Sequence, residues 1–328
     1  MTRIFINLAL CFVMVGCASL DEAATFRGSY VRGAMGTVAR IVVHAPTEAA
    51  AAQAATEGFA LIDEFERVLT DYRPDSEVAE LGRQAGRGPT KVSEVLGSVL
   101  ELSIREARRS HGAFDPTISP LVKLWREARR SGQLPSQDSR DVARSLVNYQ
   151  DIQFDPVRRT AELRRTGMAL DFGGIGKGFT ADRVVALMRS RGFNSAMCEI
   201  GGDFALGDAP PGTVGWRIGA GDGGPSLTLS NCGVATSGDV EQHVDIGGVR
   251  YSHIVDPKTG LGLTSRARVA VVAEDGTTAD ALATALSVLG PKDGFAILPA
   301  GAAARIAFGL VSPQVSTTPN YQKLSASR

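Results

Sequence analysis

Apolar and polar residues along the chain follow periodicities that predict both helices and strands. One helix is predicted to begin at Pro46-Thr47, because apolar residues then recur at the three- and four-residue spacing of one helical face. These apolar residues are Phe59, Ile62, Phe65 and Leu69. Similar patterns predict further helices, which cover roughly 93–110, 121–125, 179–191 and 278–289.

Short apolar runs bounded by turn-forming residues predict the strands. They lie at 38–43, 168–170, 196–200, 216–218, 227–229, 249–253, 268–273, 295–298 and 304–310. A hairpin is predicted over 152–163, around Asp155-Pro156. Strands and helices mix without a regular alternation, which favours an α+β fold, with mixed sheets flanked by helices, over a doubly wound sheet.

The length of 328 residues allows one large folded unit once an N-terminal segment is removed. The polar stretch 82–89 is expected to be a loop, and 133–141 a surface connection. The division of the chain that we expect is a signal peptide at 1–16, a short tether at 17–28, one folded domain at 29–311, and a polar, frayed tail at 312–328.

The overall charge restricts the kinds of partner. Lys plus Arg and Asp plus Glu both number 35, so no overall field attracts nucleic acid or a membrane surface. We therefore expect no nucleic-acid partner, and any anion site must be local. With 44% hydrophobic residues and 37 glycines, the composition is that of a globular protein with many turns.

The N-terminus predicts export. Arg3 precedes an apolar run from Ile4 to Gly16, which has the length of a signal-peptide core and is too short for a stable membrane span. Met14-Val15-Gly16-Cys17 resembles a bacterial lipobox, whose cysteine becomes the lipid-anchored first residue of the mature protein. With Ala18 next, the resemblance implies an outer-membrane lipoprotein facing the periplasm. The alternative is a simple secretory signal cut near Ala23-Ala24, which would give a soluble periplasmic protein.

Two cysteines, Cys198 and Cys232, remain in the predicted mature body. In an exported chain they can form a disulfide, but cysteines beside apolar runs are more commonly small buried hydrophobic residues. The sequence contains no CxxC pair and no Cys/His spacing typical of a metal site. This argues against zinc or redox chemistry and leaves the pairing of the two thiols open.

The stretch from Asp171 to Gly178, Asp-Phe-Gly-Gly-Ile-Gly-Lys-Gly, is the first candidate for chemistry. Its glycines allow a backbone to approach a ligand closely, and the predicted helix start adds free N–H groups suited to a phosphate. It lacks the Ser or Thr that a Walker loop needs at Gly178 and the third small residue that a dinucleotide fingerprint needs at Phe179. Taken alone, it is equally consistent with a plain strand-to-helix turn.

A second candidate is the start of the predicted helix 278–289. Asp280 and Thr284 are four residues apart, so their oxygens project from one face of the helix. A carboxylate and a hydroxyl are hard-oxygen ligands of the kind that Mg²⁺ takes. The alternative is that Thr277 or Thr278 caps the helix and Asp280 only occupies its first turn.

A third candidate is His253, in the run Ser252-His253-Ile254-Val255-Asp256-Pro257. A lone histidine in a strand-like run is more often structural than a base, but Asp256 and Asp239 can tune its pKa.

These stretches occur in an order that resembles the ApbE family of FAD:protein FMN transferases. The resemblance covers about 29–310 and rests on seven ordered motifs rather than on one glycine loop. The motifs are Met35-Gly36-Thr37, Ala113-Phe114-Asp115-Pro116, 171–178, Gly201-Gly202-Asp203, Thr236-Ser237-Gly238-Asp239, 252–257, and Ala279-Asp280 with Thr284.

The resemblance implies a role for each matching residue. The FAD contacts would be Met35, Tyr72, Ala113, Phe114, Asp115, Asp171, Lys177 and Ile254. The Mg²⁺ ligands would be the carbonyl oxygen of Gly174 and the side chains of Asp280 and Thr284. His253 would be the base. Asp256, which lies close to it in the sequence and can tune its pKa, is our second catalytic candidate.

The activity that the resemblance implies is Mg²⁺-dependent transfer of FMN from FAD to a threonine hydroxyl of a partner protein, with release of AMP. The acceptor would be an exported or membrane redox protein. Two alternatives remain open, namely an Mg²⁺-dependent FAD pyrophosphatase and a non-catalytic lipid-anchored FAD-binding protein. Intact Asp280, Thr284 and His253 argue against pure binding.

Overall fold

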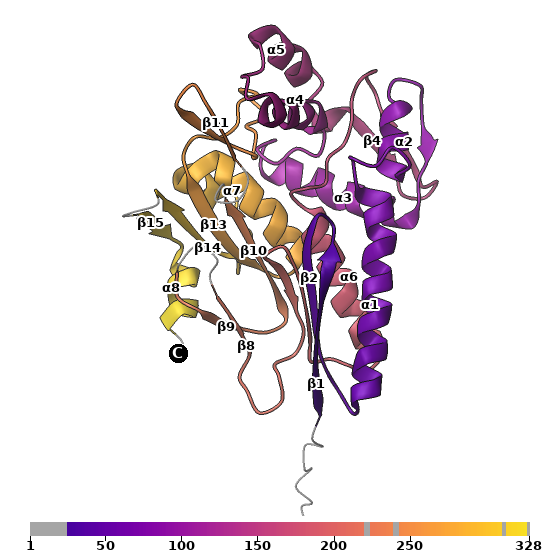
Figure 1. The fold of residues 1–328 in the computed structure, drawn as a ribbon, viewed down its shortest axis with the longest axis vertical. Helices are drawn as coiled ribbons and strands as arrows, with labels where there is room; N and C mark the ends of the chain where they lie inside the picture. Colours follow the sequence, from indigo (N-terminus) through magenta and orange to yellow (C-terminus); the bar gives the residue numbers. More distant parts are fainter. Residues whose placement is uncertain (1–24, 220–223, 239–242, 310–312, 327–328) are drawn as a thin grey trace, which may run out of the picture.

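The structure, a computed structural model, describes residues 25–219, 224–238, 243–309 and 313–326. The predicted signal peptide, the lipobox and Asp239 lie outside these residues. At the centre is an eight-stranded sheet whose neighbouring strands are all antiparallel, in the order β1-β2-β6-β7-β10-β13-β14-β15 (Figure 1). Its strands are β1 (Phe26–Ala34), β2 (Thr37–Ala45), β6 (Ala196–Ile200), β7 (Asp203–Leu206), β10 (Cys232–Gly238), β13 (Ala267–Ala273), β14 (Ala303–Phe308) and β15 (Gln314–Thr317).

Three smaller sheets and eight α-helices surround this centre in the described part of the chain. The small sheets are β3 (Thr90–Lys91) with β5 (Thr160–Leu163) and β4 (Ile152–Asp155), β8 (Trp216–Ile218) with β9 (Leu227–Leu229), and β11 (His243–Ile246) with β12 (Val249–Ser252). The helices are α1 (Glu48–Leu69), α2 (Glu77–Arg83), α3 (Glu94–Arg109), α4 (Ser119–Ser131), α5 (Gln137–Ser145), α6 (Gly176–Ser190), α7 (Gly276–Ala296) and α8 (Pro319–Ala326). The predicted α+β fold is confirmed.

The large sheet carries helices on one face and a hairpin on the other. Alternate residues of β2 show this division, because side chains of a strand point to opposite faces. Ile41 and Val43 pack with α1 and α6, whereas Val42 packs with the β8–β9 hairpin and with Tyr321 of α8. Further along the sheet, α7 covers β10 and β13 on the face that α1 and α6 occupy (Figure 1).

A second layer lies outside these helices and completes the molecule. Apolar residues of α1, α2, α3 and the β3-β5-β4 sheet enclose one side of α6 and α7 in a shared core. In that core Phe65 of α1 stacks on Phe179 of α6, with ring centroids 5.6 Å apart. The starts of α6 and α7 are therefore held between the large sheet and this outer layer.

Local sequence signals predicted several elements correctly. Thr47 caps α1 by accepting a hydrogen bond from the backbone N–H of Ala50, and Ser93 caps α3 in the same way. The hairpin of β4 and β5 turns at the predicted place. In α1, Ile62, Phe65 and Leu69 are buried, as their spacing predicted.

Three predicted segments are wrong because tertiary contacts decide them. Residues 168–170 form no strand ladder, although Met168 and Leu170 are buried. Residues 295–298 do not form a strand, because α7 continues beyond a kink at Gly290, whose φ is 70°, and ends at Ala296. The expected surface connection 133–141 contains the start of α5, which Ser136 caps.

The two ends of the described chain are more ordered than predicted. The expected tether overlaps β1, which begins at Phe26 and pairs with β2 along nine residues. The expected frayed tail forms β15, which pairs with β14, and α8, which buries Tyr321 against the sheet. A polar edge strand and a short helix have little periodic signal of their own, so pairing and one anchoring aromatic decide their structure.

None of the helices in the described ranges is both long and apolar enough to span a bilayer. The two cysteines of this part are free thiols, and Cys198 of β6 is fully buried in the core that the sheet forms with α1 and α6.

Candidate active site

The starts of α6 and α7 touch, and each helix caps the other. An added Cβ at Gly178 of α6 would lie 2.1 Å from the carbonyl oxygen of Gly276, so only glycine allows this approach. Asp280 Oδ2 of α7 accepts a hydrogen bond of 3.1 Å from the backbone N–H of Gly178. In return, the carboxylate of Asp182 on α6 accepts bonds of 2.8 Å from the backbone N–H groups of Gly276 and Thr277. This reciprocal capping fixes the register of the two helices.

Lys177 joins the start of α6 to the large sheet. Its ammonium lies 2.7 Å from Asp203 Oδ2, at the start of β7, and 3.6 Å from Asp280 Oδ2. It also donates a hydrogen bond to the carbonyl oxygen of Gly173. Although burial alone would lower the pKa of Lys177, the two carboxylates raise it, so the side chain stays charged. One ammonium thus serves two buried carboxylates.

Burial is the main reason why the pKa values of both carboxylates beside Lys177 are raised. Burial, and then the charge of Asp280, raise the pKa of Asp203 to about 7. Burial also raises the pKa of Asp280, against the lowering effect of Lys177. Such a pair is stabilised by a further cation, because Coulomb attraction is strong where water is excluded.

The predicted magnesium ligands lie around the same point. A Cβ built on Gly174 would be 2.7 Å from Thr284 Oγ1, which places this glycine directly against the hydroxyl. Thr284 is one turn after Asp280 on α7. A carbonyl, a hydroxyl and a buried carboxylate beside surplus negative charge fit the oxygen chemistry of Mg²⁺. Within the described ranges no group of three His, Cys, Asp or Glu side chains could hold a metal, and the expected set contains one carboxylate.

The alternative explanation for the start of α7 is wrong in its detail. Neither Thr277 nor Thr278 caps the helix, because Asp275 is the N-cap and accepts a hydrogen bond of 2.6 Å from Thr278 N. Asp280 therefore lies beyond the first turn, and it is 4% exposed. Capping of its own helix does not explain why this carboxylate is buried.

Asp171 is held by its own loop and by α4. One carboxylate oxygen accepts a hydrogen bond from Gly173 N, and the other lies 3.2 Å from the guanidinium of Arg126. Arg126 also forms two bonds with Asp71, of 2.6 and 3.0 Å. Burial, followed by the charge of Asp71, raises the pKa of Asp171, and Arg126 opposes this. The loop is thus anchored to the segment that leads into Tyr72.

Met35 and Tyr72, both predicted to contact FAD, are brought together by Glu66 of α1. Met35 and Gly36 turn the β1–β2 hairpin with φ values of 51° and 70°. Glu66 accepts one hydrogen bond from Met35 N and another from the hydroxyl of Tyr72, at 2.9 and 3.2 Å. Tyr72 is 58% exposed, so its ring is available to a ligand.

Ala113, Phe114 and Asp115 are buried, the first two in the core of the outer layer. The carboxylate of Asp115 accepts bonds from the backbone and hydroxyl of Thr117 and from Tyr149 N. Burial nevertheless raises its pKa. Its side chain already has three protein donors, so any flavin contact of this turn stays a prediction.

The segment with His253 follows β12 and packs against two helices. Trp125 of α4 donates a hydrogen bond to the carbonyl of Gly260, and its ring lies 5.0 Å from that of Tyr251. Ile254 lines a small cavity with Ser287, which is three residues after Thr284 on α7. Ile254, the residue after His253, therefore lies close to the part of α7 that follows the predicted metal ligands.

Asp256, our second catalytic candidate, is a turn-forming residue in this structure. Its two carboxylate oxygens accept hydrogen bonds from Lys258 N and from the hydroxyl of Thr259. These bonds stabilise the turn that leads to Gly260. Its catalytic role stays a prediction.

Sequence reasoning missed three residues that organise the site, namely Asp182, Arg126 and Glu66. Each is a charged residue within or next to a predicted helix, where charged residues are ordinary. The available signals were weak: Asp182 follows the Asp171–Gly178 loop by one helical turn, and Glu66 precedes Tyr72 by six residues.

The model of the ApbE family matches residues 35–306, and the chain belongs to this family. It is 35% identical over 317 residues to an FAD:protein FMN transferase of Treponema pallidum (strain Nichols), which covers 89% of this chain and 87% of the relative.

Two solved structures share its fold. The apo form of the Pseudomonas stutzeri flavinyl transferase ApbE superimposes with a TM-score of 0.81, at 26% identity, over 93% of this chain and 98% of that one. The flavin transferase ApbE of Vibrio cholerae gives 0.79, at 28% identity, over 92% and 100%. The family predicted from the ordered motifs is confirmed.

Proposed function

We propose that this protein transfers FMN from FAD to a threonine hydroxyl of a partner protein, with the help of Mg²⁺ and with release of AMP. Flavin transfer from FAD is supported by relatives that are named FAD:protein FMN transferases. The prediction that the protein is an FAD:protein FMN transferase is confirmed. The magnesium ion, the threonine and the roles of individual residues are our proposal.

The observation that carries the finer proposal is the cluster at the starts of α6 and α7. Lys177 contacts Asp203 and Asp280, and Gly174 lies against Thr284. Five residues from three separate parts of the sequence thus meet at one point, where Asp203 and Asp280 are buried and the other three are partly exposed. Opening a pyrophosphate requires neutralisation of charge on both phosphates, and this cluster offers one fixed cation and oxygen ligands for a second.

In the proposed reaction the threonine oxygen attacks the phosphorus of the FMN half of FAD. The bond between that phosphorus and the bridging oxygen breaks, and AMP leaves with the electron pair. Mg²⁺, held by Gly174 O, Asp280 and Thr284, would neutralise phosphate charge. Lys177 orients the phosphates, and His253 accepts the proton of the threonine hydroxyl. Met35 and Tyr72 contact FAD at the exposed hairpin side of the site.

The test is to incubate the purified protein with FAD, Mg²⁺ and a candidate acceptor domain, and then to weigh the acceptor. We expect the acceptor to gain the mass of FMN while AMP appears in equal amount. Replacing the target threonine with alanine in the acceptor should abolish the gain. An acceptor whose threonine is absent but which still gains FMN would show that another residue is modified.

Two other outcomes would point to the alternatives. Consumption of FAD with no gain in acceptor mass would assign the protein as an FAD pyrophosphatase. Binding of FAD without consumption, with Mg²⁺ present, would assign it as a carrier. Membership of the family makes both outcomes unexpected.

We also propose that the protein is exported and works on the periplasmic side, anchored through a lipid on Cys17 in an outer membrane. The support is the sequence pattern at 14–18. The acceptor would then be an exported or membrane redox protein. Labelling cells with a fatty acid should mark the wild-type protein and leave Cys17→Ala unmarked. Equal labelling of both would exclude the anchor, and a mature N-terminus near Ala24 would indicate a soluble periplasmic protein.

A further inference from the structure

The carboxylate of Asp203 is fixed by the backbone of the large sheet. Gly201 and Gly202 form the two-residue turn between β6 and β7, with φ values of 58° and 89°, and Asp203 is the first residue of β7. Asp203 is 1% exposed, and its Oδ1 accepts a hydrogen bond of 3.3 Å from the backbone N–H of Thr236 on β10. A Cβ built on Gly202 would lie 2.8 Å from the hydroxyl oxygen of Thr236, so the turn lies directly against β10. Three strands therefore set the position of this carboxylate.

The ammonium of Lys177 lies within bonding distance of Asp203 and not of Asp280. Its distance to Asp203 Oδ2 is 2.7 Å, which is typical of a charge-assisted contact, whereas Asp280 Oδ2 is 3.6 Å away. The ammonium also donates a bond of 3.2 Å to the carbonyl oxygen of Gly173. Asp280 Oδ2 accepts its hydrogen bond from the backbone N–H of Gly178 instead. Because lysine has a flexible four-carbon stem, the fixed carboxylate decides where the ammonium lies.

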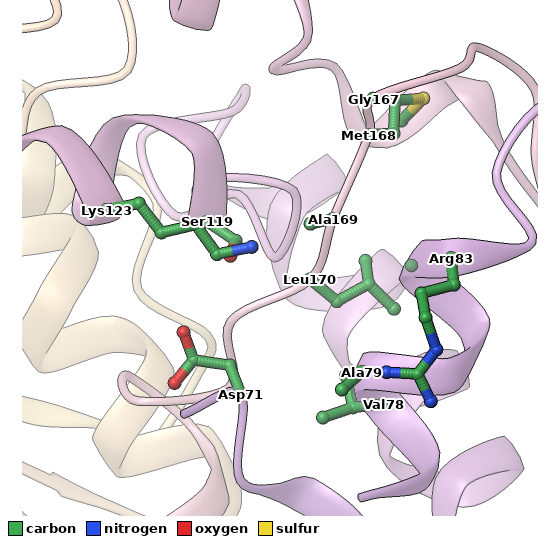
Figure 2. Close-up of a pocket in the computed structure, with 11 residues that line it drawn as sticks. Asp71, Val78, Ala79, Arg83, Ser119, Lys123, Gly167, Met168, Ala169 and Leu170 are labelled. Carbon is green, nitrogen blue, oxygen red and sulfur yellow. The ribbon is translucent and has the colours of Figure 1, made fainter. Parts of the chain in front are cut away.

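Two other carboxylates near the glycine loop are already bonded to Arg126. Its guanidinium lies 3.2 Å from Asp171 and forms bonds of 2.6 and 3.0 Å with Asp71, which lines a separate pocket (Figure 2). Besides the carboxylate on β7, the ion-pair partner of Lys177 in the described ranges is Asp280. If the β7 carboxylate lost its charge, a small rotation of the lysine stem would bring the ammonium into contact with Asp280.

An ammonium bonded to Asp280 would compete with Mg²⁺. Both are cations, and both would need the oxygens of the same buried carboxylate, which is the single carboxylate of the proposed ligand set. A direct contact between lysine and a buried carboxylate is strong, because little water screens it, so Mg²⁺ would first have to displace the ammonium. At 3.6 Å, the same ammonium leaves the carboxylate to the metal and is still placed to orient phosphate.

We propose that Asp203 is a positioning residue, which holds Lys177 away from Asp280 and so keeps that carboxylate open to Mg²⁺. It acts through Lys177 and touches neither the metal nor FAD. This inference rests on the proposed function, because the metal site belongs to the proposed reaction. It assigns a role to the last residue of the motif Gly201-Gly202-Asp203, for which the family resemblance implied none.

The test titrates Mn²⁺, a paramagnetic probe for the Mg²⁺ site, into the purified protein without FAD and measures the free ion by electron paramagnetic resonance. We expect the wild type to bind Mn²⁺ saturably and Mg²⁺ to displace it. Asp203→Asn, which keeps the size of the side chain, should weaken Mn²⁺ by about 10–100-fold, the usual range for loss of a residue that supports a metal ligand. Glu199→Gln is the control, because this carboxylate on β6 pairs with Arg40 instead, and it should change the affinity by less than about fivefold.

The decisive variant combines Lys177→Met with Asp203→Asn. If the ammonium blocks Asp280 in Asp203→Asn, its removal should recover about tenfold or more in Mn²⁺ affinity, which is within the range of coupling between residues in contact. A second substitution in the same site would not repair damage to the fold. Metal-free crystals of Asp203→Asn should show the Lys177 ammonium within about 3 Å of the Asp280 carboxylate. This last result separates occupation of the carboxylate from a simple loss of negative charge.

Failure of the inference can be told apart from failure of the metal site. A wild type that binds no Mn²⁺ would overturn the proposed metal site and the inference with it. Wild-type binding that a folded Asp203→Asn variant retains in full would overturn the inference alone. A double variant as weak as Asp203→Asn would do the same, as would crystals in which the ammonium does not move to Asp280.

A measurement on the wild type decides the question if Asp203→Asn fails to fold, as judged by far-UV circular dichroism. The ammonium resonance of Lys177, assigned by its absence in Lys177→Met, should remain slow to exchange with water when Mg²⁺ saturates the protein, because Asp203 still holds it. Loss of that protection on binding Mg²⁺ would show that Asp280 had held the ammonium, and would overturn the inference.

Discussion

The two carboxylates that cap α6 and α7 make the same local contact in very different surroundings. Asp182 gives its oxygens to the start of α7, where two backbone N–H groups and the hydroxyl of Thr277 donate to it. Asp280 accepts one backbone bond from Gly178 and also faces Lys177, which Asp203 shares. One cap is satisfied by the helix it holds, and the other is part of a cluster with surplus negative charge.

This difference indicates that, of two carboxylates in the same helix pair, one stabilises the fold and the other is available for function. A carboxylate whose donors all belong to the protein can do nothing for a ligand without breaking those bonds. A carboxylate that shares its cation retains the capacity to bind another one. We therefore infer that Asp182 fixes the position of α7 and that Asp280 uses that position for chemistry.

The largest effect is expected for Asp280→Asn. The amide oxygen can still accept the bond from Gly178 N, but the negative charge is lost. Turnover of FAD with Mg²⁺ should fall on the order of 1,000-fold, the upper range for loss of one charge-stabilising group. The free energy of unfolding, measured with urea, should change by less than about 1 kcal/mol. Unchanged turnover would remove α7 from the metal site.

The opposite pattern is expected for Asp182→Ala. Three donors at the start of α7 lose their acceptor, at about 1 kcal/mol each, so the free energy of unfolding should fall by about 3 kcal/mol. Turnover per folded molecule should fall far less than in Asp280→Asn. The control Asp182→Asn keeps one acceptor and should be intermediate in stability. A variant that is fully stable but inactive would mean that Asp182 takes part in the reaction.

The dependence of stability on pH provides a smaller, independent test. Burial, opposed by Thr277 and reinforced by the charge of Asp275, raises the pKa of Asp182 to about 6 from its usual 3.8. The folded state therefore binds the proton more tightly than the unfolded state, so this group stabilises the fold at low pH. Its contribution should decrease by about 2 kcal/mol as the pH rises from about 4.5 to about 7.

The measurement compares wild type with Asp182→Asn over that range of pH. Their difference in free energy of unfolding removes the contributions of other titrating groups that the two proteins share. A difference that stays constant from pH 4.5 to 7 would show that the pKa of Asp182 is not raised.

The sequence alone predicted elements whose signals are local. The caps Thr47 and Ser93 and the turn after Asp155 each act on neighbouring residues, so their helices and hairpin were predicted correctly. Residues 168–170 were predicted as a strand because an apolar run has the same pattern whether or not a partner strand exists. Whether a partner strand is present depends on the tertiary structure, which the periodicity of the sequence does not show.

The residues of the candidate site were predicted from sequence motifs, and local physical rules alone would not have brought them together. Asp280 and Thr284 were found because a helix places them on one face, and the structure brings Gly174 and Lys177 to them. Asp182 and Arg126 were missed, because a charged residue on the polar face of a helix is unremarkable until its distant partner is known. Both act across more than 40 residues of sequence.

The smallest effects are expected for substitution of Arg126, which holds the loop at Asp171. Unlike the carboxylate of Asp280, its side chain is partly exposed. Its side chain is 36% exposed while it holds Asp71 and Asp171, so water screens both ion pairs. Arg126→Met should therefore lower the free energy of unfolding by less than about 1 kcal/mol and weaken FAD binding by at most about fivefold. Arg126→Lys, which keeps the charge without the paired bonds to Asp71, should lie between the two. Titration of FAD by its fluorescence measures the affinity, and a loss beyond about 20-fold would show that Arg126 contacts FAD itself and does not act only through the loop.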